Sequence, residues 1–300
     1  ATFQMQVDKD IDSHAFSLGN TFRKCERHSL YVFSGGPFLS EGDTFYDGSD
    51  GRHGWPARLK WEDAVAAIAL KGGTGGKVET QTDAFQGGSH MRISNAYFEN
   101  CRDCINLSRA TPEYPPGVTI QKFFDVSITD CKFVDTLRRD ILLNNGDPDV
   151  TGLWANIVVE RTKHINQSGA YPFETGVPIQ LVVASFQDMV LRDIELHIRE
   201  GGDYSIITTL NCMLIYGRGS SSEFASNNLV IERVIGNCEP VSESNITAQR
   251  VIQVHNSVYK PGETDDVIIR DVTAPAGVTP VNPTSGSNTH YKVNVNPYNL

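Results

Sequence analysis

Apolar residues in the middle of the chain recur in short steps, in which two of them flank a single intervening position. Six steps share this pattern and lead into polar residues: Met91–Ile93, Val126–Ile128, Ile157–Val159, Met189–Leu191, Leu229–Ile231 and Val267–Ile269. Their first residues are separated by 35, 31, 32, 40 and 38 positions. Alternation with a period of two indicates β-strands, and its recurrence indicates a repeated structural unit.

A second apolar step follows the first within five of the repeats. These steps are Ile105–Leu107, Ile141–Leu143, Ile179–Leu181, Ile206–Thr208 and Ile252–Val254. Each repeat therefore predicts at least two short strands, and turn-forming residues separate them. Asp or Asn stands just before four of the first strands, at Asp125, Asn156, Asp188 and Asp266.

One repeat cannot fold alone. Burying four or five aliphatic side chains gains roughly 10 kcal/mol, whereas ordering about 31 backbone residues costs roughly 30 to 60 kcal/mol. Stacking each repeat on its neighbours shares the core and pairs every strand with the equivalent strand above and below. The sequence thus predicts an all-β parallel solenoid. The rival fold, a two-sheet sandwich, gives turn signals every 8 to 12 residues without a longer recurring unit.

Helical spacing is found in one segment, residues 61–71. Its apolar face consists of Trp61, Ala64, Val65, Ile68 and Ala69. This spacing predicts an amphipathic helix that caps the N-terminal end of the solenoid. We therefore expect an irregular N-terminal segment over residues 1–60, a β-helix domain over 61–273, and a C-terminal cap or tail over 274–300 that contains a strand at 291–295.

Composition and charge narrow the function. The 300 residues include 26 Lys and Arg against 36 Asp and Glu, a formal net charge of −10, which disfavours nucleic acid as a partner. No apolar run approaches the roughly 18 residues of a membrane-spanning helix, and Ala1–Asp10 has no signal-peptide pattern. Six Cys residues without a paired zinc spacing are expected to be mostly buried small hydrophobes.

Segment 61–71, the Gly-Gly turn after it, Asp103–Leu107 and Asp125–Ile128 together resemble a known superfamily. They look like the right-handed parallel β-helix of pectate-lyase-like proteins, which include pectate lyases, polygalacturonase-type hydrolases and phage tailspike depolymerases. The resemblance covers roughly residues 61 to 272 and implies a long glycan lying along one sheet face. The Gly-His-Gly motif of the polygalacturonase-type hydrolases is missing from the sequence, so no subfamily is assigned.

Solenoid geometry suggests candidate catalytic carboxylates. Neighbouring rungs lie about 4.8 Å apart, so carboxylates on adjacent or next-adjacent rungs approach the separations used in retaining or inverting glycoside hydrolysis. Asp103 and Asp140 precede the second strand of successive repeats, and Glu174 lies in a loop one rung further along. We predict these three as catalytic residues; a turn-forming role for the two Asp residues is the alternative.

Neighbouring residues complete the predicted site. Tyr171 and Phe173 flank Glu174 and are predicted to bind sugar rings, together with Lys163. Elimination is the alternative chemistry and needs a base beside a neutralised uronate carboxylate, for which Arg139 is the candidate. Asp147 and Asp149 form the better of two possible calcium sites, although a plain turn explains them equally; no cofactor is otherwise expected.

The leading hypothesis is an extracellular or virion-associated protein that binds and depolymerises an acidic or surface polysaccharide, by hydrolysis or elimination. The second hypothesis is a non-catalytic receptor-binding or structural fibre protein. Solenoids in such fibres often trimerise along their axis, so a homotrimer is the assembly that this second hypothesis suggests.

Overall fold

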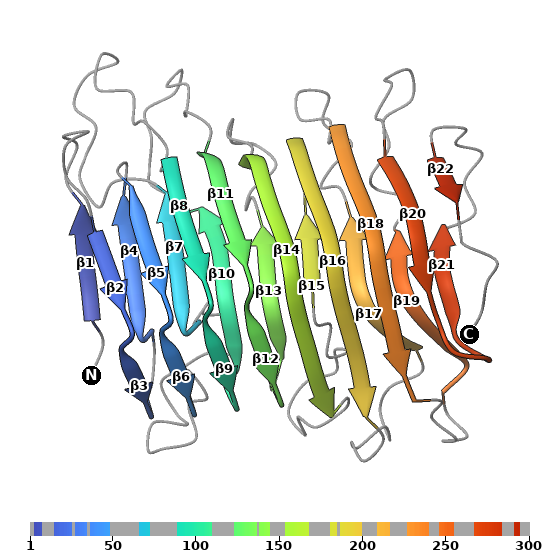
Figure 1. Ribbon diagram of the computed structural model, residues 1–300, viewed down its shortest axis with the longest axis horizontal. Helices are drawn as coiled ribbons and strands as arrows, with labels where there is room; N and C mark the ends of the chain where they lie inside the picture. The colour runs from blue at the N-terminus through green and yellow to red at the C-terminus, as the bar shows by residue number, and fades with distance from the viewer. Residues whose placement is uncertain are drawn as a thin grey trace.

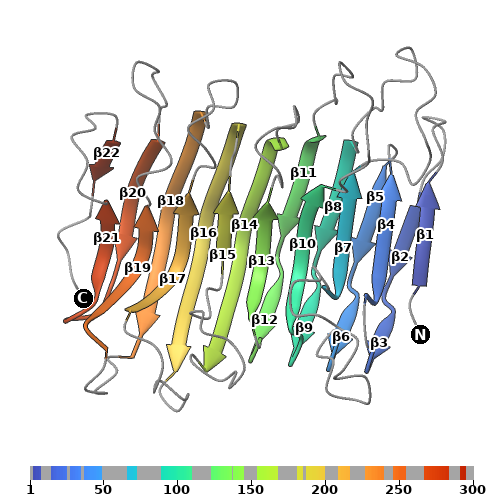
Figure 2. The same ribbon diagram turned by 180° about the vertical axis from the view of Figure 1, so that it is seen from behind.

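The fold is an all-β stack of parallel strands, seen in a computed structural model of the 300-residue chain (Figure 1). The structure describes residues 3–7, 15–25, 28–34, 37–48, 66–72, 89–109, 123–136, 138–144, 154–167, 181–184, 187–199, 209–216, 227–239, 246–254, 267–283 and 291–294. Strand β1 lies at one end of the stack, and β21 and β22 lie at the other (Figures 1 and 2). No described helix is long and apolar enough to cross a membrane.

The first wall of the coil is a nine-stranded sheet to which each turn of the chain contributes one strand. In spatial order these are β1 (Phe3–Val7), β4 (Leu30–Ser34), β7 (Ile68–Gly72), β10 (Asp103–Arg109), β13 (Arg139–Asn144), β15 (Leu181–Ala184), β17 (Thr209–Tyr216), β19 (Ala248–Val254) and β21 (Thr279–Pro283). Spatial order therefore follows chain order, as it must in a solenoid.

The second wall lies opposite and is built in the same way. It contains β2 (Ala15–Leu18), β5 (Phe38–Glu41), β8 (Ser89–Ser94), β11 (Phe123–Thr129), β14 (Trp154–Gln167), β16 (Gln187–Arg199), β18 (Asn227–Cys238), β20 (Val267–Thr273) and β22 (Tyr291–Asn294). The third wall contains β3 (Thr21–Arg23), β6 (Thr44–Tyr46), β9 (Tyr97–Glu99) and β12 (Lys132–Val134). It joins the second wall at β14, which pairs with both β11 and β12.

The predicted repeat is confirmed in register. Met91, Val126, Ile157, Met189, Leu229 and Val267 pair with one another in turn along the second wall. On the first wall Ile105 pairs with Ile141, but Leu181 and Met213 occupy the next two positions. The predicted starting residues Ile179 and Ile206 lie outside the described part of the chain. All strand pairs between described residues are parallel, which excludes the sandwich alternative.

The predicted capping helix is wrong where the structure describes it. Residues 61–65 lie outside the described residues, but Ile68–Gly72 form strand β7. Ile68 pairs with Leu30 on one side and with Ile105 on the other, so this segment lies inside the stack. Ala66, Ala67 and Ile68 are completely buried where the chain enters the wall.

The N-terminal and C-terminal segments also continue the coil. Six strands, β1 to β6, lie within residues 1–60, which were expected to be irregular, and β4, β5 and β6 pair with β7, β8 and β9. Strands β21 and β22 lie within residues 274–300, and β22 includes most of the strand expected at 291–295. Parallel pairing thus extends well beyond residues 61–273.

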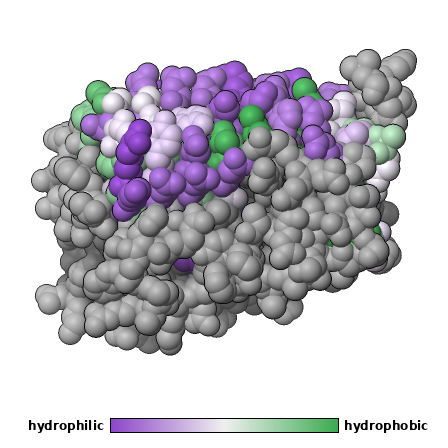
Figure 3. All heavy atoms as spheres, turned by 90° about the horizontal axis from the view of Figure 1, so that it is seen from below, coloured by the Kyte–Doolittle hydropathy of each residue, from purple (hydrophilic) through white to green (hydrophobic). Residues whose placement is uncertain are grey.

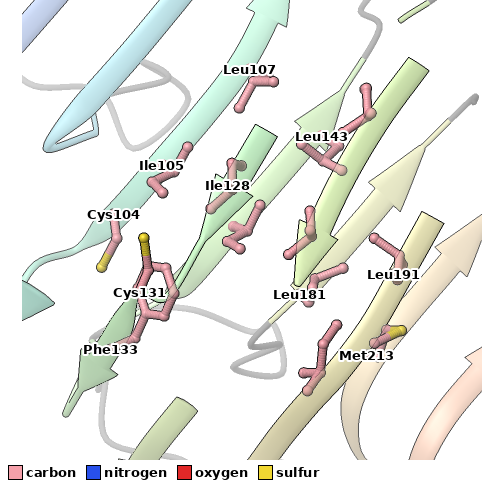
Figure 4. Packing of buried hydrophobic residues seen from close by; sticks show 14 of the residues in the cluster. Cys104, Ile105, Leu107, Ile128, Cys131, Phe133, Leu143, Leu181, Leu191 and Met213 are labelled. Carbon is pink, nitrogen blue, oxygen red and sulfur yellow. The ribbon is translucent and has the colours of Figure 1, made fainter. Parts of the chain in front are cut away.

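The interior is filled by side chains that meet from all three walls. Figure 4 shows Ile105 and Leu107 from β10, Ile128 from β11 and Phe133 from β12 turned towards a common centre. Cys25, Cys101, Cys104, Cys131 and Cys212 are buried free thiols, which confirms the expected role of these five Cys residues. Burial raises the pKa of the Cys131 thiol to about 12, so it stays protonated and behaves as a small apolar group.

An aromatic column runs through the third wall on its inner side. Phe22, Phe45, Phe98, Phe133 and His164 stack in turn, with ring centroids 4.7 to 5.0 Å apart. Leu196 and Gly236 continue the same positions. A Cβ at Gly236 would overlap Val251, so the interior narrows there to a space that only glycine fits.

His164 ends the aromatic stack and brings polar atoms into the core. Its Nδ1 lies 2.8 Å from Oδ2 of Asp140, and its Nε2 lies 3.0 Å from Oγ1 of Thr162. The side chains of His164 and Asp140 are both 0% exposed. Both ring nitrogens are therefore satisfied, and the buried carboxylate has a hydrogen-bonding partner.

Replacing His164 tests this internal contact. His164→Phe keeps the stack but leaves the Asp140 carboxylate without its imidazole partner, so we expect the free energy of unfolding to fall by about 3 to 5 kcal/mol. The double variant His164→Phe/Asp140→Leu should recover most of that loss because no buried charge remains. Denaturant unfolding measures both; equal losses in the single and double variants would contradict this account.

Candidate groove on the second wall

A column of left-handed residues runs along the second wall, near the first residues of β8, β11, β14, β16 and β18. His90, Asp125, Asn156, Asp188 and Asn228 have φ between 51° and 60°. Each directly precedes a buried residue that pairs in register with its equivalents, so the five align from rung to rung. Asp and Asn tolerate this conformation better than other non-glycine residues, which explains why they occur at the turn into each strand. We call this set the corner column.

Side chains of the corner column bind one another along the coil axis. Asn156 Nδ2 donates to Asp125 Oδ1 at 3.4 Å, and Asn228 Nδ2 donates to Asp188 Oδ1 at 2.7 Å. At the N-terminal end, His90 Nδ1 lies 3.4 Å from Asp125 Oδ2. Amide and carboxylate groups thus alternate on one exposed edge.

A groove of about 900 Å³ lies beside the corner column. Its floor consists of half-exposed outward side chains of the second wall: Ser127, Val158, Val190, Val230 and Ile268. A second hollow of about 620 Å³ shares His90, Arg92, Ser127 and Val158 with the first and reaches Phe16 and Leu39. The two hollows together cross the strands from β2 to β20 and follow the coil axis.

Two residues beyond the floor positions, the strands carry a ladder of alternating charge, of which Glu160 and Arg192 line the second hollow. Glu160, Arg192, Glu232 and Arg270 pair in register on successive rungs. Arg192 Nε donates to Glu160 Oε2 at 2.6 Å, and Arg270 Nε donates to Glu232 Oε2 at 2.7 Å. Each charge therefore faces its opposite on the next strand.

A second ladder lies one residue further along the chain on each rung. Its charges have the opposite order to those of the first ladder. Asp130, Arg161, Asp193, Arg233 and Asp271 all have left-handed φ and alternate in charge. Arg161 makes a bidentate contact with Asp130 at 2.8 and 3.0 Å, and Arg233 makes one with Asp193 at 2.6 and 2.9 Å. Arg161 and Arg233 also bind Glu160 and Glu232 of their own strands, which joins the two ladders into one network.

This network lowers the pKa of its carboxyl groups. Burial alone would raise the pKa of Glu160, but hydrogen bonds from Arg192 and Arg161 outweigh it. The hydrogen bond from Arg270 lowers the pKa of Glu232, and those from Arg161 and Arg233 lower the pKa of Asp130 and Asp193. The ionised form of each carboxylate is therefore stabilised in the folded state.

Viewed from below, the described residues form a mainly hydrophilic band with scattered apolar positions (Figure 3). The half of β14 that pairs with β12 continues the third wall. Lys163, predicted to bind substrate, lies on this wall, where its Nζ is 2.7 Å from Glu195 Oε2; His197 Nε2 is 3.1 Å from the same oxygen. Lys163 does not line the groove.

The predicted catalytic pair lies inside the coil. Asp103 is 1% exposed and its Oδ2 is 3.4 Å from Arg138 Nη1; Asp140 is 0% exposed and contacts His164. Asp103 pairs in register with Arg139, the candidate residue for elimination, so Asp103 and Asp140 differ by one position. A polysaccharide on the surface cannot contact either carboxylate in this arrangement. The spacing of the apolar steps along the chain did not reveal this burial.

The remaining predicted site residues cannot be placed. Glu174, Tyr171 and Phe173, together with Asp147 and Asp149 of the calcium prediction, lie outside the described residues. Among the described residues no group of three or more His, Cys, Asp or Glu side chains is arranged to hold a metal ion.

Sequence reasoning recognised three of the five residues of the corner column but gave them no function. Asp125, Asn156 and Asp188 were noted only as residues that precede strands. Their recurrence at one position of each repeat was the available signal, because equal positions in a solenoid repeat lie in one line on the surface. The alternation of Glu160-Arg161, Arg192-Asp193, Glu232-Arg233 and Arg270-Asp271 was the second signal, and it was missed.

Comparison with known proteins gives little further information. No protein-family model matches the chain, and no curated protein is similar enough in sequence to match. Two solved structures of the tailspike protein of E. coli bacteriophage HK620, a double and a single mutant, each in complex with a pentasaccharide, show a weak structural similarity. Both are 10% identical, with TM-scores of 0.32 and 0.33, and 98% and 93% of this chain is covered. The chain spans 59% and 52% of those chains.

The charge network predicts acid sensitivity. Because the folded pKa values are lowered, the unfolded chain binds more protons in acid, so stability is retained above about pH 4 to 5 and lost as pH falls further. Glu232→Gln should cost about 1 kcal/mol at pH 7 and should lose less stability than the parent protein between pH 5 and pH 3. Denaturant unfolding at several pH values measures this.

Glu41→Gln is the matched control for that variant. Glu41 lies in the same column of the second wall, where its register partners are the uncharged Leu18 and Ser94. The free energy of unfolding of this control should change with pH in the same way as that of the parent protein. Parallel stability curves for Glu232→Gln and the parent protein would contradict a stabilising network.

Proposed function

We propose that the groove on the second wall binds an extended, hydroxyl-rich polysaccharide that lies along the coil axis. The observation that carries the proposal is the corner column, which repeats a hydrogen-bonding side chain once per rung beside a continuous hollow. A linear polymer can meet equivalent groups at regular intervals only on a surface that itself repeats. The groove is open at the surface, as the binding of a long chain requires.

The two sides and the floor have the chemistry that sugars need. Carboxylate and amide groups of the corner column accept hydrogen bonds from hydroxyl groups, and the amides also donate them. Val158, Val190 and Val230 offer an apolar floor on which the C–H faces of sugar rings can pack. The side chains of Asp125 and His90 are 42% and 62% exposed, so ligand hydroxyls can reach them.

Removing one amide from the corner column tests binding. Asn156→Gly deletes the side chain but suits φ 53°, because glycine adopts positive φ without strain. We expect polysaccharide binding to weaken about fivefold to tenfold through the loss of one hydrogen-bonding group. Affinity for a panel of bacterial surface and plant cell-wall glycans, measured by biolayer interferometry, is the readout.

Asn100→Gly is the matched control. Asn100 also has φ 53°, and it donates to Asp47 Oδ1 at 3.4 Å, the same distance as the contact of Asn156 with Asp125. It does not line the groove, so its replacement should leave binding unchanged. Equal effects of the two variants, or no binding of any glycan by the parent protein, would overturn the proposal.

Cleavage of the bound polymer is a second candidate function, favoured by one observation. Asp125 and Asp188 occupy the same position of the corner column two rungs apart, with Asn156 between them. That places their backbones about 9.5 Å apart, close to the carboxylate separation of inverting glycosidases. One carboxyl group would protonate the leaving oxygen as the glycosidic C–O bond breaks, and the other would take a proton from the attacking water.

Neutralising each carboxylate tests cleavage. Asp125→Asn and Asp188→Asn should each lower the release of reducing ends by at least about 100-fold while the glycan still binds. Asp47→Asn, in a different corner with φ 50°, should cleave normally. Unchanged rates in both variants would exclude this pair. Glycans that bind but are never cut would favour the non-catalytic alternative of a receptor-binding or structural protein.

Elimination has less support than hydrolysis because neither Arg139 nor Lys163 lines the groove. The extracellular or virion-associated location, the homotrimer and the calcium ion stay predictions.

A further inference from the structure

The groove carries more negative than positive charge where a ligand would lie. Asp125 and Asp188 stand along the main hollow, whereas Arg92 is its single fully cationic lining residue among those the structure describes, at the end near His90. The formal charge of the chain is −10, so the surrounding field adds to the repulsion of anions. A polymer with one carboxylate or sulfate per sugar would place negative charges against both Asp side chains.

The cations of the two charge ladders beside the groove are already engaged. Arg192 binds Glu160, and Arg270 binds Glu232, at hydrogen-bond distance. Arg161 and Arg233 are held by bidentate contacts with Asp130 and Asp193. A polyanion could recruit these guanidinium groups only by breaking charge-assisted hydrogen bonds, which are about twice as strong as neutral ones.

The hydrogen-bonding groups of the corner column also disfavour an anionic ligand. Ionised Asp accepts hydrogen bonds and cannot donate them. Asn156 and Asn228 each give one amide N–H to a neighbouring Asp, which leaves one N–H as a donor and the carbonyl oxygen as an acceptor. The column therefore presents mostly acceptors, and a good ligand must bring donors. Hydroxyl and acetamido groups supply donors, whereas carboxylate and sulfate groups add only acceptors.

We propose that the groove selects uncharged, donor-rich polysaccharides and rejects polyanionic ones. The inference rests on the proposed function and deepens it by naming the substrate class. It departs from the acidic glycan that the sequence led us to expect. Within the groove, Asp125 and Asp188 set the preference.

Binding to polymers that differ only in charge tests the selection. Fully methyl-esterified galacturonan and its de-esterified form share one backbone, as do hydroxyethyl and carboxymethyl cellulose. We expect the neutral member of a bound pair to bind at least about tenfold more tightly at low salt. Added salt should narrow the difference because it screens the repulsion.

Variants that remove negative charge test whether the Asp residues of the groove cause the preference for neutral polymers. Asp125→Asn/Asp188→Asn keeps side chains that tolerate left-handed φ and should raise affinity for the anionic polymer about tenfold while neutral binding changes only a few-fold. The control Asp47→Asn/Asp135→Asn changes net charge by the same amount at left-handed positions that do not line the groove. It should leave the discrimination nearly intact.

The outcomes separate the two proposals. If no polymer of either kind binds, the proposed function fails. If polymers bind but the anionic member binds as tightly as the neutral one, the inference fails and the proposed function stands. Equal effects of the groove and control double variants would also overturn it, because the preference would then come from overall charge alone.

Discussion

In-register pairing of parallel strands around one interior is the constraint on which the rest of the structure depends. No single turn of the chain can bury enough apolar surface to fold, so each turn relies on the turns above and below it. Once Met91, Val126 and Ile157 are paired, every other position of those turns is aligned as well. Columns of like residues then follow, both in the core and on the surface.

Surface charge helps to fix that register. A slip of one residue would expose the aliphatic pairs and bury their neighbours. It would also set Glu160 and Glu232 beside the wrong partners, because Glu-Arg and Arg-Asp pairs alternate from one rung to the next. The left-handed corners act in the same direction, since Asp and Asn adopt that conformation more readily than the aliphatic residues that follow them.

The sequence was most informative where a pattern repeated. The strand pairs of the second wall were predicted correctly because alternation and spacing both recur at fixed positions. The first wall was predicted less well: Leu181 and Met213, and not residues two or more positions earlier, pair with Ile141 and Ile252. Segment 61–71 was misread: Ile68–Gly72 form a strand that pairs on both sides, and the spacing of apolar residues along the chain does not reveal such long-range pairing. Asp103 and Asp140 were chosen by spacing, which does not reveal whether a side chain points into the coil or out of it.

The candidate site depends on the same register, because the groove is a functional surface only if Ser127, Val158, Val190 and Val230 lie side by side. A disulfide between adjacent rungs tests this most directly. Val158→Cys/Val190→Cys replaces two residues paired in register, whose backbones lie about 4.8 Å apart, and mass spectrometry should find the two thiols cross-linked under mild oxidation. Val158→Cys/Arg192→Cys, offset by two residues to about 8 Å, should not cross-link. Failure of the first pair, or equal cross-linking of both, would contradict the in-register stack.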